Sequence, residues 1–155
     1  MACEFKIRRR VEFAETDMAG ILHFSNFFRF MEEAEHAFFR SLDLRVHAAG
    51  GAGMWGMARA HAECRYRRPL HYEDVVELHV VVREMTDKLI IYDVVFTNRG
   101  RDDVDDGAHE SARGSMTAIC VAKPAGSDRM RARLLPPEVA ERVEAAAPGV
   151  LPADS

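Results

Sequence analysis

The chain has 155 residues, of which 48% are hydrophobic and 30% are charged, and its formal net charge is −4. This length suits one domain that buries its own core, and the slightly acidic balance excludes a broadly basic surface for nucleic acid. The three cysteines are odd in number and lack metal-ligand spacing, so we expect free thiols in a reducing cytoplasm. No apolar run is long enough to cross a bilayer, and the first residues lack the apolar stretch of a secretory signal.

The first two elements are a strand and a helix. Residues 4–13 are typical of an extended strand, and residues 25–42 carry the clearest helical pattern, with Ser25 or Asn26 as its expected cap. Apolar side chains recur there at helical spacing, at Phe27, Phe30, Met31, Ala34, Phe38 and Leu42. The acidic residues fall largely outside this stripe and are expected on a solvated face: Glu32, Glu33 and Glu35.

Four strand-like runs follow a glycine-rich connection. Residues 47–56 hold four glycines and are expected to be flexible. The later runs alternate apolar and polar residues or are apolar on both faces, and they cover 57–67, 75–85, 89–97 and 111–122. Short connections between them predict antiparallel pairing, and a short helix is expected over 137–147.

These elements predict an α+β fold. One antiparallel sheet has to cover one long apolar helix, and small residues on the strand faces leave room for that helix to lie close. We assign residues 1–147 to this single domain. Residues 148–155, rich in Ala and Pro, are expected to form a flexible tail.

A single carboxylate, Asp17, lies in the short loop between the first strand and the helix. The start of a helix offers free backbone N–H groups and a positive dipole end. A carboxylate beside it suits a nucleophile or a base next to an oxyanion site. Seen as a loop residue alone, Asp17 more often serves to hydrogen-bond the backbone of its own turn.

The stretch from Val11 to Phe27 resembles the hotdog-fold acyl-CoA thioesterases of the 4-hydroxybenzoyl-CoA thioesterase family. The matching pattern consists of an Asp, small residues, two aliphatics and a helix entry, here Asp17, Ala19-Gly20, Ile21-Leu22, Phe24 and Asn26. A weaker likeness continues through Arg68-Pro69-Leu70 and Tyr72-Glu73-Asp74. His23 departs from the pattern, because the family often has an aromatic residue there. The resemblance implies the hotdog fold, in which an antiparallel sheet wraps around one long central helix.

The same resemblance implies the roles of the loop residues. Asp17 is expected to attack the thioester carbonyl or to activate a water, and the backbone N–H near His23 or Phe24, which we assign to Phe24, to polarise the thioester oxygen. The expected substrate-binding residues around this loop are Gly20, His23, Asn26 and Phe27. Further apolar side chains that are expected to face the pocket are Phe28, Met54 and Trp55.

The nucleotide end of CoA carries phosphates, so its site needs cations near the surface. The candidates are Arg83, Lys88, Arg129 and Arg131. The scattered histidines form no metal-binding motif. We therefore expect no metal and no cofactor besides the CoA of the substrate.

The sequence predicts a hydrolase that converts a short-chain or aromatic acyl-CoA to the free acid and CoA. Two alternatives stay open: a hotdog module that binds acyl-CoA without catalysis, and a thioesterase for acyl chains on a carrier protein. Because a single sheet leaves an unpaired edge, and the family pairs two sheets edge to edge, we expect a homo-oligomer, a dimer or tetramer. Neither nucleic acid nor a membrane is an expected partner.

Overall fold

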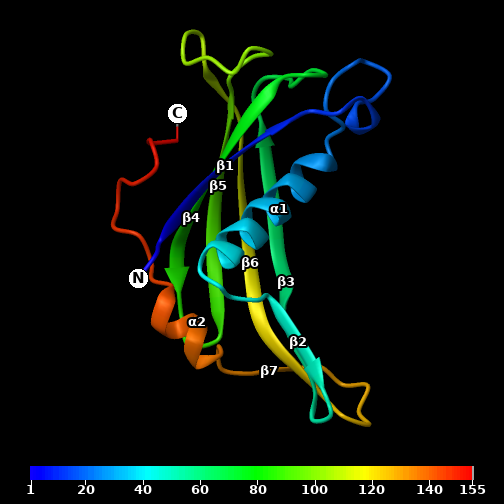
Figure 1. Cartoon of the computed structure of the whole chain (residues 1–155), viewed down its shortest axis with the longest axis vertical. Helices are drawn as coiled ribbons and strands as arrows, with labels where there is room; N and C mark the ends of the chain where they lie inside the picture. The colour runs from blue at the N-terminus through cyan, green and yellow to red at the C-terminus, as the bar shows by residue number, and fades with distance from the viewer. Residues whose placement is uncertain (155) are drawn as a thin grey trace.

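The computed structural model describes residues 1–154 and consists of one curled antiparallel sheet with a helix on its concave face (Figure 1). The strands are β1 (Glu4–Arg10), β2 (His47–Gly50), β3 (Gly53–Tyr66), β4 (Val75–Met85), β5 (Leu89–Asn98), β6 (His109–Pro124) and β7 (Arg131–Ala132). They lie in the order β1-β4-β5-β6-β3-β2, and β7 pairs with β6. Among residues 1–154 no helix is long and apolar enough to cross a membrane.

Helix α1 (Asn26–Ser41) confirms the helix predicted over 25–42, because the stripe residues that it contains, from Phe27 to Phe38, are buried. The expectation that the sheet wraps around one long central helix is wrong, because α1 is short compared with the strands. At about 1.5 Å per residue, the 16 residues of α1 span roughly 24 Å. The 16 residues of β6 span roughly twice that length, so α1 covers only part of the sheet (Figure 1).

Small residues on β6 let the helix approach the sheet closely. A Cβ atom at Gly114 would lie 2.2 Å from the Sδ atom of Met31 on α1, so a larger side chain fits there only if Met31 moves. Ala112 and Ala118, on the same face of β6, are fully buried. This confirms the expectation that small strand residues leave room for α1.

Several predicted boundaries are wrong where long-range pairing overrides the local pattern. The first strand ends at Arg10, and a short 3-10 helix, η1 (Phe13–Glu15), follows it. The glycine-rich segment 47–56 is not a flexible connection, because its two halves pair as β2 and the start of β3. The C-terminal helix α2 (Pro137–Arg142) is shorter than expected.

The predicted solvated face of α1 needs one correction. Glu35 is only 1% exposed, and its Oε2 atom lies 2.7 Å from Nη2 of Arg59 on β3. A register irregularity between Arg59 and His61 explains this pairing. It shifts the alternation of β3, so that Arg59 shares the face of the buried Ala118 while His61 pairs with Thr117.

Candidate active site

The predicted catalytic loop is a tight turn that begins at Asp17. The backbone N–H of Asp17 donates to the carbonyl of Ile21 at 2.9 Å, and the N–H of Gly20 donates to the carbonyl of Asp17 at 3.0 Å. Gly20 has a φ of +79°, a conformation that glycine adopts without steric cost. The turn therefore requires the glycine that the sequence supplies.

Two neighbouring segments hold this turn in place. The N–H of Leu22 donates to the carbonyl of Leu70 at 2.7 Å, which ties the loop to the segment before β4. The carbonyl of Glu15 accepts from the N–H of His23 at 2.9 Å and from Nδ2 of Asn26 at 2.8 Å. Asn26 is thus not the predicted helix cap but a side chain that joins the first turn of α1 to the loop.

The two carboxylate oxygens of Asp17 have different surroundings. Oδ1 accepts from the N–H of Ala19 at 2.8 Å and, at 3.5 Å, from the N–H of Ile21. Within residues 1–154, no group donates to Oδ2. One oxygen therefore holds the turn while the other is available for chemistry, so the structural and chemical roles of Asp17 are compatible.

The start of α1 leaves backbone donors without an acceptor among residues 1–154, and the N–H of Phe24 is one of them. The N–H of His23 is used by Glu15, and the N–H of Ser25 points to Nδ1 of His23 at 3.3 Å. The N–H of Phe24 has no acceptor in the described part of the chain. Ser25 makes no side-chain cap, because its hydroxyl lies 2.7 Å from Nδ1 of His23. At this uncapped helix start, the Phe24 N–H lies at the positive dipole end of α1, which favours a negatively charged oxygen.

Two hollows flank Asp17. One is a pocket of about 330 Å³ whose apolar lining is Ile21, Leu22, Phe24, Phe27, Tyr66 and Pro69. Arg67 and Arg68 complete its rim. The other is a broad open hollow of about 1270 Å³ on the far side of the loop, bordered by Phe13, Met18, Gly20 and His23. Asp17 and Phe24 line both hollows, so the turn lies between them.

The structure brings only part of the predicted site together. Asp17, Gly20, His23, Phe24 and Phe27 lie around the two hollows. Asn26 is adjacent in sequence but engaged with Glu15. His23 stacks on the Phe24 ring with centroids 4.6 Å apart, and its Nδ1 atom is occupied by Ser25, so it lines the hollow without contacting Asp17.

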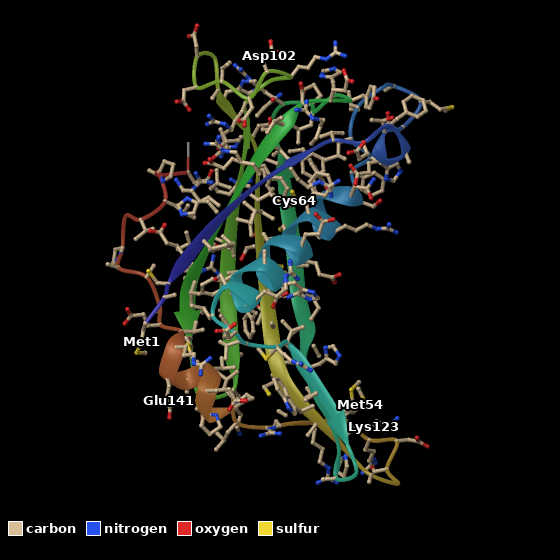
Figure 2. The ribbon with its side chains drawn as sticks, viewed as in Figure 1. Met1, Met54, Cys64, Asp102, Lys123 and Glu141 are labelled. Atoms are coloured by element: carbon tan, nitrogen blue, oxygen red, sulfur yellow. The ribbon has the colours of Figure 1, made fainter. Side chains whose placement is uncertain are left out.

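The other predicted residues lie at the opposite end of the sheet within one chain. Met54 and Trp55 begin β3, whereas Tyr66 at its end borders the Asp17 pocket, a separation of roughly 35 Å along the strand. Figure 2 shows Met54 and Lys123 at the lower tip and Cys64 in the upper half. Met54 and Trp55 line a separate apolar pocket of about 270 Å³, so they do not belong to the Asp17 pocket of their own chain.

The predicted cations are exposed and lie outside the Asp17 pocket of their own chain. Arg131 pairs with Ala122 near the start of β3, and Arg129 lies in the connection before it. Lys88 is in the turn between β4 and β5. Arg83 is engaged with Asp93 at 2.8 Å. None of these four residues lines the Asp17 pocket of the same chain.

Sequence reasoning missed Tyr66 and Arg68 at the pocket. Tyr66 is the last residue of β3, and Arg68 follows within two residues. The available signal was Arg68-Pro69-Leu70, which carried a weak resemblance and which the structure places against the Asp17 loop through Leu22 and Leu70. Among residues 1–154, no group of three or more His, Cys, Asp or Glu side chains is arranged to hold a metal ion.

Comparison with known proteins identifies the family of this chain. The model of the thioesterase-like superfamily matches residues 11–143, which include the whole Asp17 loop, α1 and the main strands. The chain belongs to the thioesterase-like superfamily.

Two curated relatives resemble part of this thioesterase-like chain. A protein of Aquifex aeolicus (strain VF5), named "Putative esterase", is 42% identical over 82 residues, 53% of this chain and 63% of the relative. A 1,4-dihydroxy-2-naphthoyl-CoA hydrolase of Parasynechococcus marenigrum (strain WH8102) is 32% identical over 85 residues, 48% of this chain and 54% of the relative. The chain thus matches less than two thirds of the length of these relatives.

A solved structure shows the fold. The 4-hydroxybenzoyl-CoA thioesterase from Pseudomonas sp. strain CBS-3 superposes with a TM-score of 0.75 at 17% identity, covering 90% of this chain and 99% of that one. The arrangement of a curled antiparallel sheet with one helix is therefore the hotdog fold, as the Asp17 loop predicted.

Proposed function

We propose that the protein is an acyl-CoA thioesterase that hydrolyses a thioester to a free acid and CoA. One observation carries this proposal. The carboxylate oxygen of Asp17 that has no donor and the N–H of Phe24 that has no acceptor in the described chain belong to residues that line the same pocket, at the start of α1. Family membership supports the same chemistry.

In the proposed reaction, Oδ2 of Asp17 is the reacting oxygen. It either attacks the thioester carbon, with CoA leaving as the thiolate and water then cleaving the acyl-Asp anhydride, or removes a proton from a water that attacks directly. Negative charge develops on the thioester oxygen in both routes. A backbone donor such as the Phe24 N–H stabilises that charge by about 3 kcal/mol. No metal or organic cofactor takes part in these steps, and a cytoplasmic location is part of the same proposal.

The lining of the smaller pocket favours an aromatic or short acyl group. Its walls are formed by Phe24, Phe27 and Tyr66 together with aliphatic side chains. The similar hydrolase of Parasynechococcus marenigrum is named for an aromatic acyl-CoA, 1,4-dihydroxy-2-naphthoyl-CoA. An aromatic ring can stack against these side chains, which makes this acyl class our first candidate.

We further propose a homodimer in which the second chain completes each site. Among residues 1–154, β2 pairs with β3 only over Gly53–Gly56, so the outer edge of β3 is unpaired over most of its length. Antiparallel pairing of two such edges would bring the Met54 end of one β3 beside the Tyr66 end of the other. The apolar pocket at Trp55 and the basic Arg129 and Arg131 of one chain would then approach Asp17 of its partner. The arginines are proposed to hold the CoA phosphates there, together with Arg83 and Lys88.

Two alternatives differ in what they predict. A non-catalytic acyl-CoA-binding module would bind acyl-CoA and release no thiol, and the free Oδ2 of Asp17 argues against it. A thioesterase for carrier-protein substrates would hydrolyse the acyl-carrier protein faster than the matching acyl-CoA.

The test measures thiol release from a panel of acyl-CoAs, including aromatic ones, with the wild type and Asp17→Asn. Asn keeps an Oδ1 acceptor for the N–H groups of Ala19 and Ile21, so the turn should persist, whereas Asp17→Ala would also remove the turn. We expect kcat to fall roughly a thousandfold or more with unchanged thermal stability. Asp106→Asn, at an exposed loop position, is the control and should keep wild-type turnover. Near-normal turnover by Asp17→Asn would refute the mechanism.

A further inference from the structure

The last residue of β3, Tyr66, reaches across to the start of α1. Its hydroxyl donates to the backbone carbonyl of Phe24 at 3.0 Å, a contact between residues 42 positions apart. Its ring meets that of Phe27 edge-on, with centroids 4.9 Å apart. Tyr66 therefore contacts the backbone of one pocket residue and the side chain of another.

The contact matters because it immobilises the peptide units that flank Phe24. The carbonyl of His23, in the peptide that contains the Phe24 N–H, accepts from the N–H of Asn26 at 2.9 Å. The next peptide, which contains the Phe24 carbonyl, is held by Tyr66. With both planes restrained, the direction of the Phe24 N–H is set before any substrate binds.

We propose that Tyr66 is a positioning residue that orients the Phe24 N–H toward the thioester oxygen. This inference rests on the proposed function, since it assigns a role in that reaction. Tyr66 acts through the backbone of Phe24, so its hydroxyl should influence the rate of the chemical step more than substrate affinity. Oxyanion donors are effective because they are oriented in advance, and that orientation is what the hydroxyl supplies.

The surroundings of Tyr66 keep its hydroxyl in the donating form. Cys64 lies two residues before Tyr66 on β3. Burial and the neighbouring Cys64 raise the pKa of Tyr66, so the hydroxyl stays protonated across the neutral range. Burial likewise raises the pKa of the Cys64 thiol to about 12, which leaves Cys64 as a neutral neighbour. Cys64 lies in the upper half of β3 in Figure 2.

The experiment compares Tyr66→Phe with the wild type in steady-state hydrolysis of the best acyl-CoA. Phe keeps the ring against Phe27 and removes only the hydroxyl. We expect kcat to fall between about threefold and about thirtyfold, less than the hundredfold or more typical of deleting a donor, with KM changed by less than about twofold. The matched control is Tyr72→Phe, a second half-exposed tyrosine that packs edge-on against Phe13, and it should keep wild-type kcat.

Amide hydrogen exchange provides a readout that does not depend on turnover. In Tyr66→Phe the amides of Ser25 and Asn26, which are hydrogen-bonded to His23, should exchange faster, while those in the middle of α1 keep their rates. Unchanged kcat, a loss confined to KM, or unchanged exchange at Ser25 and Asn26 would overturn the positioning role. If the wild type hydrolyses no thioester, the proposed function fails by itself, and the exchange comparison still decides whether Tyr66 restrains Phe24.

Discussion

At the scale of single residues, the Asp17 turn combines two requirements in one side chain. Oδ1 stabilises the turn by accepting from Ala19 and Ile21, and Oδ2 is left without a donor in the described chain. An Asp in a loop is usually explained by the first role alone. Here the geometry accommodates both roles, and the chemical role of Asp17 stays a prediction.

Gly20 allows a prediction with a close control. Gly20→Ala places a Cβ in open space but at a φ of +79°, which should cost about 1 kcal/mol of folding free energy. Because Gly20 closes the Asp17 turn, its replacement should also reduce kcat. Gly107→Ala has nearly the same φ, +78°, and equally open space, but lies in the loop between β5 and β6.

Thermal melting and thiol release distinguish the two glycine variants. Both should lower Tm by about 2–4 °C, and only Gly20→Ala should lower kcat. Equal turnover by the two variants would show that the Asp17 turn tolerates the strain and does not need glycine for activity.

At the scale of elements, the irregularity in β3 joins the sheet to the helix through an ion pair. Arg59 lies where the register shifts, and its guanidinium contacts the buried carboxylate of Glu35 on α1. The side chain of Arg59 is 30% exposed, whereas that of Glu35 is 2% exposed. If its partner is removed, Arg59 can therefore be solvated by water, whereas the carboxylate of Glu35 stays buried.

We predict unequal costs for breaking this pair. Arg59→Met strands a buried carboxylate and should destabilise the fold by about 3–5 kcal/mol. Glu35→Met leaves an arginine that can turn toward water, so its cost should be about 1 kcal/mol. The double variant should recover most of the loss, because an apolar pair replaces the ion pair.

Urea denaturation at one protein concentration measures these differences. Equal destabilisation by Arg59→Met and Glu35→Met would mean that Glu35 reaches solvent when unpaired. Glu35 would then behave as the solvated residue that the sequence pattern predicted.

At the scale of the whole molecule, a single chain leaves its site open. The edge of β3 is unpaired beyond Gly56 among the described residues, and exposed aromatic side chains surround the Asp17 loop, with Phe13 74% and Phe24 62% exposed. Unpaired edges and exposed apolar surface are features that association removes. Light scattering should therefore detect at least a dimer at micromolar concentration, and a stable monomer would contradict the shared site.

Subunit mixing tests whether Asp17 and the basic residues of one site come from different chains. Asp17→Asn and the double variant Arg129→Ala with Arg131→Ala should each be impaired when measured below the wild-type KM. In a mixed dimer, one of the two sites would combine the intact Asp17 of one chain with the intact arginines of the other. After unfolding and refolding together in equal amounts, about a quarter of wild-type sites should be restored. No recovery would place both functions within one chain or remove the arginines from the site.

The sequence by itself determined the elements whose signals are local. The apolar stripe of α1 and the alternation in β4 follow from periods of 3.6 and 2 residues, which a short window contains. The Asp17 loop was equally readable, because its turn is closed by Gly20 and by hydrogen bonds that span at most four residues.

Only the tertiary structure decided the features that depend on distant partners. β2 exists because residues 47–50 pair with 53–56, and Glu35 is buried because a shift in β3 turns Arg59 toward it. Tyr66 reaches Phe24 across 42 residues, a contact with no periodic signature. Such contacts depend on how β3 packs beside α1, and packing sums many weak interactions from the whole chain that no local pattern contains.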